Sequence, residues 1–215
     1  MDLLSEDEQW DALKRWVRTN GPSVVVMVAL ALLAWFGWRW WQDRQNRQAL
    51  EAGAIYTQVL ADFDAGKLDI GLAGIEKLRS DYPGSAYVAV ADLAAANMFV
   101  ANNDLEKAVI YLDRVTNSAK DKLLRPIARL RLARVQAAQA QYDKALATLG
   151  TADMGAHQSA YLEARGDVLF AKGDRAAALK EYEASRALLS PESAGPEGVG
   201  MVLDLKISDL KATEK

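Results

Sequence analysis

The side chains that most often carry catalysis or bind metal ions are nearly absent from this 215-residue chain. It contains no cysteine, which excludes disulfides, thiolate zinc sites and cysteine nucleophiles. Its single histidine, His157, follows a glycine-containing stretch, and a lone histidine in such a loop is usually a surface residue. The sequence has no glycine-rich phosphate loop, Gly-x-Ser-x-Gly or His-Glu-x-x-His motif. We therefore expect no enzyme activity, no cofactor and no metal site.

The charged residues are typical of solvated helix surfaces rather than of a binding centre. Acidic residues often stand beside lysine, as in Glu106-Lys107 and Lys180-Glu181. The net charge is −3 and the sequence pI is about 5.3, so the chain lacks the basic footprint of a nucleic-acid-binding protein. Alanine, the strongest helix former, occupies 38 positions and proline only five. This composition predicts an all-α fold.

The first 41 residues predict a membrane anchor, because they hold all six tryptophans and a long apolar run. Between Arg18 and Arg39 lie 20 residues without a charge, which at 1.5 Å per residue would cross the hydrocarbon core of a bilayer. Aromatic residues and an arginine at the end of the run fit a headgroup-level belt: Trp35, Trp38, Arg39, Trp40 and Trp41. We therefore expect a tail at 1–18 and a transmembrane helix at 19–41, with Pro22 in its first turn.

Two other interpretations of the apolar run are a buried core helix and a cleaved signal peptide. Ala29-Leu30-Ala31 has the small-x-small form of a cleavage site, but the apolar run continues beyond it and ends in bulky aromatic residues. An uncleaved signal anchor is therefore favoured. Its orientation is not set by charge, because three basic residues flank each side: Lys14, Arg15 and Arg18 before the run, and Arg39, Arg44 and Arg47 after it.

From residue 42 to 189 the chain predicts about four helix pairs of the tetratricopeptide type. Small residues that would let paired helices approach recur at spacings of 37, 37 and 33, at Gly71, Ala108, Ala145 and Ala178. Gly166 and Tyr182 complete the pattern of the last pair. Turn residues separate the helices of each pair: Ala65-Gly66-Lys67, Asn102-Asn103-Asp104, Gln141-Tyr142-Asp143 and Lys172-Gly173-Asp174. Ser85 and Ser159 are expected as helix N-caps.

An irregular alanine-rich bundle is the alternative, and the combined turn signals and spacing favour the repeat. Residues 190–215 predict a proline- and glycine-rich loop and a final helix that caps the exposed end of the stack. Some tetratricopeptide grooves bind a partner's terminal carboxylate through lysine, asparagine and arginine. Asn97 stands at a matching position, but Leu93 stands where the lysine is needed, so that clamp is not expected.

Several short sequences stand out along the chain: Gly37-Trp38-Arg39-Trp40-Trp41, Leu105-Glu106-Lys107-Ala108, Leu130-Arg131-Leu132-Ala133-Arg134-Val135-Gln136, and Arg165-Gly166-Asp167 with Lys172-Gly173-Asp174. Together they resemble the YfgM family, the ancillary subunit of the bacterial SecYEG translocon. The resemblance implies a single-pass protein of the bacterial inner membrane with a cytoplasmic N-terminus and a periplasmic repeat domain. It also implies that SecYEG, periplasmic chaperones and the lipid bilayer are its partners, and that translocated proteins pass through it to those chaperones.

A second class of function is equally compatible with the repeats, namely a periplasmic scaffold for envelope assembly or cell division. The repeats themselves do not distinguish the two. Residues 190–200 depart most from the family pattern.

Overall fold

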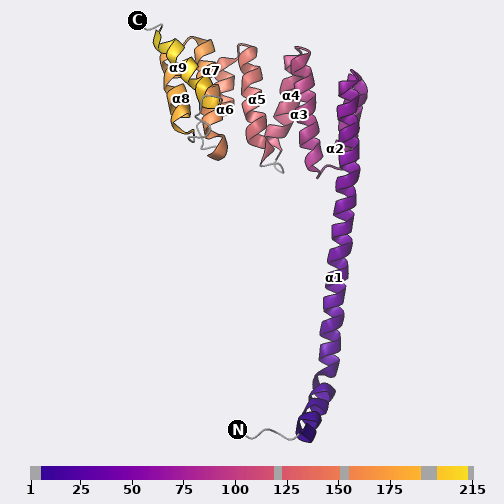
Figure 1. Ribbon diagram of the computed structural model, residues 1–215. Coiled ribbons are helices and arrows are strands. Elements are labelled where there is room, and N and C mark those ends of the chain that lie inside the picture. The colour runs from indigo at the N-terminus through magenta and orange to yellow at the C-terminus, as the bar shows by residue number, and fades with distance from the viewer. Residues whose placement is uncertain (1–5, 119–122, 151–154, 190–197, 213–215) are drawn as a thin grey trace. The chain divides into compact units, whose positions relative to one another are not determined.

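The computed structural model describes residues 6–118, 123–150, 155–189 and 198–212, and all regular elements within these ranges are helices (Figure 1). The all-α prediction is confirmed. The elements are α1 (Glu6–Asp64), α2 (Leu68–Asp81), α3 (Ala86–Ala101), α4 (Leu105–Asn117), α5 (Leu124–Ala138), α6 (Tyr142–Leu149), the 3₁₀-helix η1 (Gly155–His157), α7 (Gln158–Lys172), α8 (Arg175–Ala187) and α9 (Val199–Ala212). The chain divides into two units, residues 1–51 and 52–215.

In the first unit, α1 bends near its N-terminal end (Figure 1). The expectation that Pro22 opens the helix is wrong, because α1 begins at Glu6 and Pro22 lies inside it. Proline has no N–H to donate to the carbonyl four residues earlier, which is the usual cause of such a bend. Two side chains donate to carbonyls in the preceding turn: Thr19 Oγ1 to Arg15 O at 3.0 Å and Asn20 Nδ2 to Trp16 O at 3.2 Å.

In the second unit, antiparallel helices pair in chain order. Helix α3 packs on α4, α5 on α6 and α7 on α8, while α9 packs on α8 (Figure 1). The last turns of α1 supply Val59 and Phe63 to the same core as Ile75 of α2. Helices α3, α5 and α7, the first members of their pairs, also contact one another along the stack. The second unit is therefore a row of four helix pairs followed by one further helix.

All four pairs turn in the same way. The chain adopts a positive φ at Gly66, Asn103, Ala140 and Gly173, with values of 71°, 58°, 59° and 96°. The next N–H then donates to the carbonyl five residues earlier, at 2.8–2.9 Å in each turn, which is the hydrogen bond of a Schellman helix end. These four residues are spaced 37, 37 and 33 apart, as are the small residues that follow them. The repeat is thus visible in backbone geometry.

Helix starts explain where the sequence predictions succeed and fail. Ser85 caps α3 by accepting the Tyr87 N–H, and Asp104 and Asp174 cap α4 and α8 in the same manner. The prediction that Ser159 is a cap is wrong, because α7 begins at Gln158 and Ser159 instead bonds Ser185 of α8. The turn predicted at 141–143 is also displaced. It lies at 139–141, and Tyr142 is already helical.

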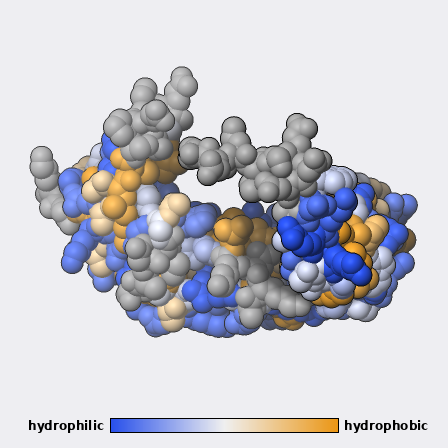
Figure 2. Space-filling view, turned by 90° about the horizontal axis from the view of Figure 1, so that it is seen from below, coloured by the Kyte–Doolittle hydropathy of each residue, from blue (hydrophilic) through white to orange (hydrophobic). Residues whose placement is uncertain are grey.

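Buried apolar side chains form three successive clusters along the stack. The first cluster contains residues of every helix from α1 through α5, and the second contains residues of α5, α6 and α7. The third joins α8 to α9 through Tyr182, Leu203 and Leu210. Hydrophilic side chains cover much of the surface in Figure 2, with an apolar band at the left over the C-terminal helices. Each pair therefore buries its apolar face against the next, as stacked repeats require.

Candidate functional site

The residues predicted to lie at a membrane interface are on α1, and their side chains are exposed. Trp35, Trp38, Trp40 and Trp41 are all at least half exposed, and Arg39 is exposed as well. The Trp38 and Trp41 rings lie 5.4 Å apart, and the Arg44 guanidinium lies 5.8 Å from the Trp40 ring. Among the described residues, α1 is the one helix long and apolar enough to cross a membrane, and none of its most apolar stretch is buried inside the protein. Such a surface is stable in lipid and unfavourable in water.

The predicted packing residues lie inside the second unit, between paired helices. Gly71, Ala108, Ala145 and Ala178 are buried. A side chain at Gly71 would collide with the Phe63 ring of α1, and one at Gly166 would collide with the Tyr182 ring of α8. The structure thus brings Gly166 and Tyr182 together and places the other four in separate pairs. These residues position helices and offer no reactive group.

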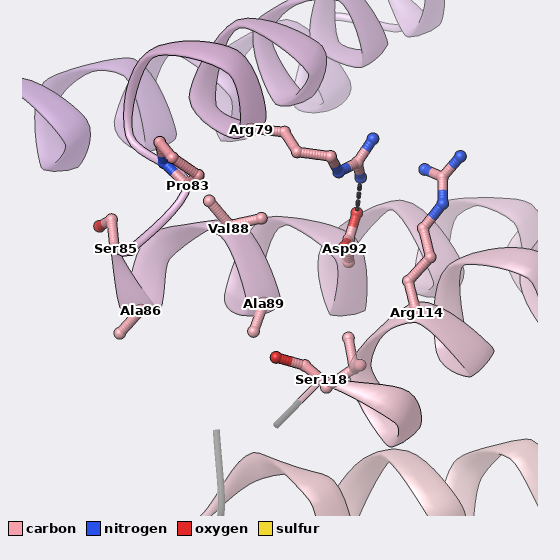
Figure 3. Close-up of a pocket in the computed structure, with 11 residues that line it drawn as sticks. Arg79, Pro83, Ser85, Ala86, Val88, Ala89, Asp92, Arg114 and Ser118 are labelled. Atoms are coloured by element: carbon pink, nitrogen blue, oxygen red, sulfur yellow. Dashed lines mark hydrogen bonds and ion pairs between the residues drawn. The ribbon is translucent and has the colours of Figure 1, made fainter. Parts of the chain in front are cut away.

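A pocket of about 290 Å³ opens where α2, α3 and α4 meet (Figure 3). Small apolar residues and two serines line most of it: Pro83, Ala86, Val88, Ala89, Val115, Ser85 and Ser118. Its charged groups come from three helices, with Arg79 on α2, Asp92 on α3 and Arg114 on α4. The Arg79 Nη2 donates to Asp92 Oδ1 at 2.6 Å, and Nη1 donates to Glu76 at 2.5 Å.

Asp92 is the one strongly perturbed carboxyl group in this pocket. Its side chain is about 5% exposed, and burial raises its pKa from 3.8 to about 6, although the charges of Arg79 and Arg114 oppose the shift. Its carboxylate is already bound to Arg79, and this ion pair joins α2 to α3 across the turn between them. No histidine or cysteine lines the pocket to act as a base or nucleophile beside it.

Metal chemistry finds no support in the described residues, where no group of three histidine, aspartate or glutamate side chains is placed to hold an ion. His157 ends η1 and is half-buried.

Sequence reasoning missed the polar contacts that hold α9 on the stack. Lys206 Nζ donates to Glu163 at 2.8 Å and to Asp167 at 2.6 Å, both on α7. The Tyr182 hydroxyl also donates to Asp167 at 2.7 Å, and burial followed by this hydrogen bond raises the pKa of Tyr182. The spacing of Glu163 and Asp167, one helical turn apart, is the only local signal. Their partner lies 43 and 39 residues away in sequence.

Together these features define a class: a tetratricopeptide-type helical stack whose chain also carries an exposed apolar helix of membrane-spanning length. A profile described as a tetratricopeptide repeat-like domain matches residues 14–212. A crystal structure of nearly identical TPR-like repeats from Podosopora anserina superposes with a TM-score of 0.55 at 14% identity, covering 75% of this chain and 85% of that one. This likeness supports the fold alone.

Two curated relatives give the particular family. The ancillary SecYEG translocon subunit of Escherichia coli K12 is 34% identical over 84% of this chain and 86% of its own length. The protein of the same name from Neisseria gonorrhoeae is 31% identical over 94% of this chain and 97% of its own length. The chain belongs to the family of ancillary SecYEG translocon subunits, which confirms the resemblance found in the sequence.

Proposed function

We propose that this protein is a non-enzymatic accessory subunit of the Sec translocon in the bacterial inner membrane. Its N-terminus would be cytoplasmic and its repeat domain periplasmic. One observation carries the proposal. The helix that contains 20 consecutive uncharged residues, none of them buried, also supplies Val59 and Phe63 to the core of the repeat stack. The repeat stack and the proposed membrane anchor thus share helix α1.

The anchor supports the function by confining the stack to the membrane in which the translocon lies. Tethering converts a second contact into an intramolecular one, so a weak contact becomes effective without added area. The names of the relatives support SecYEG as the membrane partner. We propose that the repeats in turn contact periplasmic chaperones and pass translocated proteins to them.

The enzyme alternative lacks a reacting centre among the described residues. The perturbed carboxyl of Asp92 is engaged by Arg79, and the perturbed phenol of Tyr182 donates to Asp167. Both groups join neighbouring helices rather than face a substrate. The repeats therefore contribute surface, which is how helical solenoids bind other proteins.

The experiment separates the two halves of the chain. Replacing residues 1–41 with a cleavable signal peptide should abolish copurification with SecY and leave chaperone binding intact. A matched control replaces the same residues with an unrelated single-pass anchor of the same orientation. If SecY is lost in both, the native anchor itself makes the contact, and if the unrelated anchor restores it, tethering suffices.

Copurification of SecY with the signal-peptide version would contradict this division of roles, because the repeats would then dock on the translocon unaided. Recovery of peptidoglycan synthases, in place of SecY and chaperones, from crosslinked native membranes would contradict the proposed function. It would favour the scaffold for envelope assembly.

A further inference from the structure

Helix α5 carries an unusual concentration of positive charge for a chain whose net charge is −3. Between Leu124 and Ala138 it holds four arginines and no acidic residue: Arg125, Arg129, Arg131 and Arg134. In the part of the chain that the structure describes, none of the four forms an ion pair with a carboxylate, whereas Arg79, Arg114, Arg165 and Arg186 all do. Among the described residues, helix α5 is therefore a basic element in the middle of the stack whose arginines pair with no carboxylate.

The four arginines differ in what they face. Arg125 Nη2 donates to the Ser118 carbonyl at 2.7 Å, and Arg129 lies close enough to Tyr161 to influence its phenol. Arg131 reaches back to α3, where its Nη1 donates to Asn97 Oδ1 at 3.4 Å. Arg134 is exposed. Arg134 follows Arg131 by three residues, so the two guanidinium groups leave neighbouring positions on one face of α5.

Asn97, Val100, Arg131 and Arg134 form what we call the α3–α5 strip. Asn97 is exposed, and Val100 adds an apolar patch that is 43% exposed. Both helices are first members of their pairs, and they contact each other along the stack. The strip therefore combines hydrogen-bond donors, positive charge and a small apolar surface on adjacent helices.

The next helix along the stack shows the opposite arrangement. Glu163 and Asp167 of α7 are bound by Lys206 of the terminal helix, so the acidic residues of this helix row are neutralised within the chain. Within the described ranges, no carboxylate neutralises Arg131 or Arg134 of the strip in this way. A carboxylate-bearing ligand is the complementary partner, because guanidinium groups bind carboxylates through paired, charge-assisted hydrogen bonds.

We propose that the α3–α5 strip binds an extended polypeptide segment through its internal aspartate or glutamate side chains. The inference rests on the proposed function insofar as the ligand is a protein. A clamp for a terminal carboxylate is not available, because Leu93 occupies the lysine position and is itself buried. Val100 favours segments in which an aliphatic side chain adjoins the acidic one.

The test uses the full chain in detergent and a labelled dodecapeptide in which glutamate alternates with threonine. Fluorescence anisotropy should show binding that weakens as salt rises, because the contacts are exposed. The same peptide with glutamine in place of glutamate should bind about tenfold more weakly or worse. The double variant Arg131→Gln/Arg134→Gln should lose affinity to a similar extent.

The control removes the same charge from the second helices of two pairs. Lys144→Gln/Lys180→Gln alters exposed lysines of α6 and α8 and should leave affinity within about twofold. Circular dichroism should show both double variants folded. Equal losses in the two variants, equal binding of the glutamate and glutamine peptides, or no binding of either peptide would overturn the proposal.

Two further outcomes distinguish the possible failures. A single-stranded oligonucleotide that competes as well as the acidic peptide would mark the strip as a general polyanion surface and overturn the peptide site. Loss of peptide binding in Arg131→Gln/Arg134→Gln with SecY copurification unchanged supports the strip as a separate site. Peptide binding by a wild-type chain that does not copurify with SecY would refute the proposed function and leave the strip standing.

Discussion

Gly166 lies directly against the ring of Tyr182, so that a Cβ built on the glycine would stand 2.5 Å from Tyr182 Cε1. The two residues are sixteen apart, and the same interval separates a buried alanine from a buried leucine in the two preceding pairs, Ala96 with Leu112 and Ala133 with Leu149. In the last pair, the larger Tyr182 therefore stands where the two preceding pairs have leucine, and the smaller Gly166 stands where they have alanine.

This relationship predicts that Gly166→Ala destabilises the stack by about 1–3 kcal/mol, because the ring must shift in a closely packed interface. Tyr182→Leu in the Gly166→Ala background should recreate the alanine–leucine combination of the two preceding pairs. We expect the double variant to cost less than the sum of the single changes in a urea unfolding cycle. Strict additivity would contradict the contact.

The same packing argument applies to the alanines at the other helix crossings. Ala145→Leu and Ala178→Leu should each lower the free energy of unfolding by about 1–3 kcal/mol, because both positions are fully buried. Ala147→Leu and Ala184→Leu make the identical change at exposed positions of the same helices and should stay within about 0.5 kcal/mol. Thermal melts that do not separate the buried pair from the exposed pair would show that these alanines do not lie at crossings.

The turn between α5 and α6 places an alanine where the other turns have glycine or asparagine. Ala140 has φ 59°, a left-handed conformation that costs an L-residue roughly 1–2 kcal/mol. Ala140→Gly should therefore raise the unfolding free energy by about 1 kcal/mol. Gly173→Ala at the equivalent turn should lower it by a similar amount, so a shared sign for the two substitutions would refute the argument.

Ala140 also shows why the sequence located this turn incorrectly. Turn prediction depends on residues that tolerate a positive φ, and Gly66, Asn103 and Gly173 belong to those types. Ala140 does not belong to them, so the turn was predicted instead at the residues that follow it, Gln141-Tyr142-Asp143. The structure imposes the turn because α5 and α6 must pack as the other pairs do, and tertiary packing overrides local preference.

The apolar anchor and the repeat spacing were accessible to sequence analysis because both depend on local, periodic patterns. The contacts of Asp92 with Arg79 and of Lys206 with Glu163 were not, because they join residues 13 and 43 apart on different helices. Nothing in the composition of those segments marks the partners. The arginines of α5 that pair with no carboxylate in the described residues likewise become apparent only from the three-dimensional structure.

Asp92 makes the stability of the stack depend on pH. Its pKa of about 6 in the folded protein exceeds the ordinary value of 3.8, so between these pH values the folded state binds more protons than the unfolded state. The contribution of Asp92 to the free energy of unfolding therefore falls as pH rises through this window. The free energy of unfolding of Asp92→Asn, relative to that of the wild type, should therefore rise by up to about 3 kcal/mol between pH 4 and pH 7.

Two companion variants test the cause of this pH dependence. Arg79→Gln removes a charge that lowers the pKa of Asp92, so the inflection in unfolding free energy should move to higher pH. Asp64→Asn, at an exposed position, should follow the wild type throughout. If wild type and Asp92→Asn show parallel pH profiles in urea titrations, burial of Asp92 does not control the dependence.

The proposed orientation needs an experimental test, because the numbers of basic residues on the two flanks of the anchor are equal. Alkaline phosphatase fused after Lys215 should be active, since the enzyme needs the oxidising periplasm to form its disulfides. A fluorescent reporter that matures only in the cytoplasm should be dark at the same site.

Positive charge retains a flank in the cytoplasm, and three basic residues lie on each side of the apolar run. Changing Lys14, Arg15 and Arg18 to glutamine leaves basic residues only on the C-terminal flank of the apolar run. This variant should shift part of the population to the inverted orientation, with lower phosphatase activity and measurable fluorescence. In the wild type, an inactive phosphatase fusion together with a fluorescent cytoplasmic reporter would show that the repeats face the cytoplasm. This result would contradict the proposal that the repeats contact periplasmic chaperones.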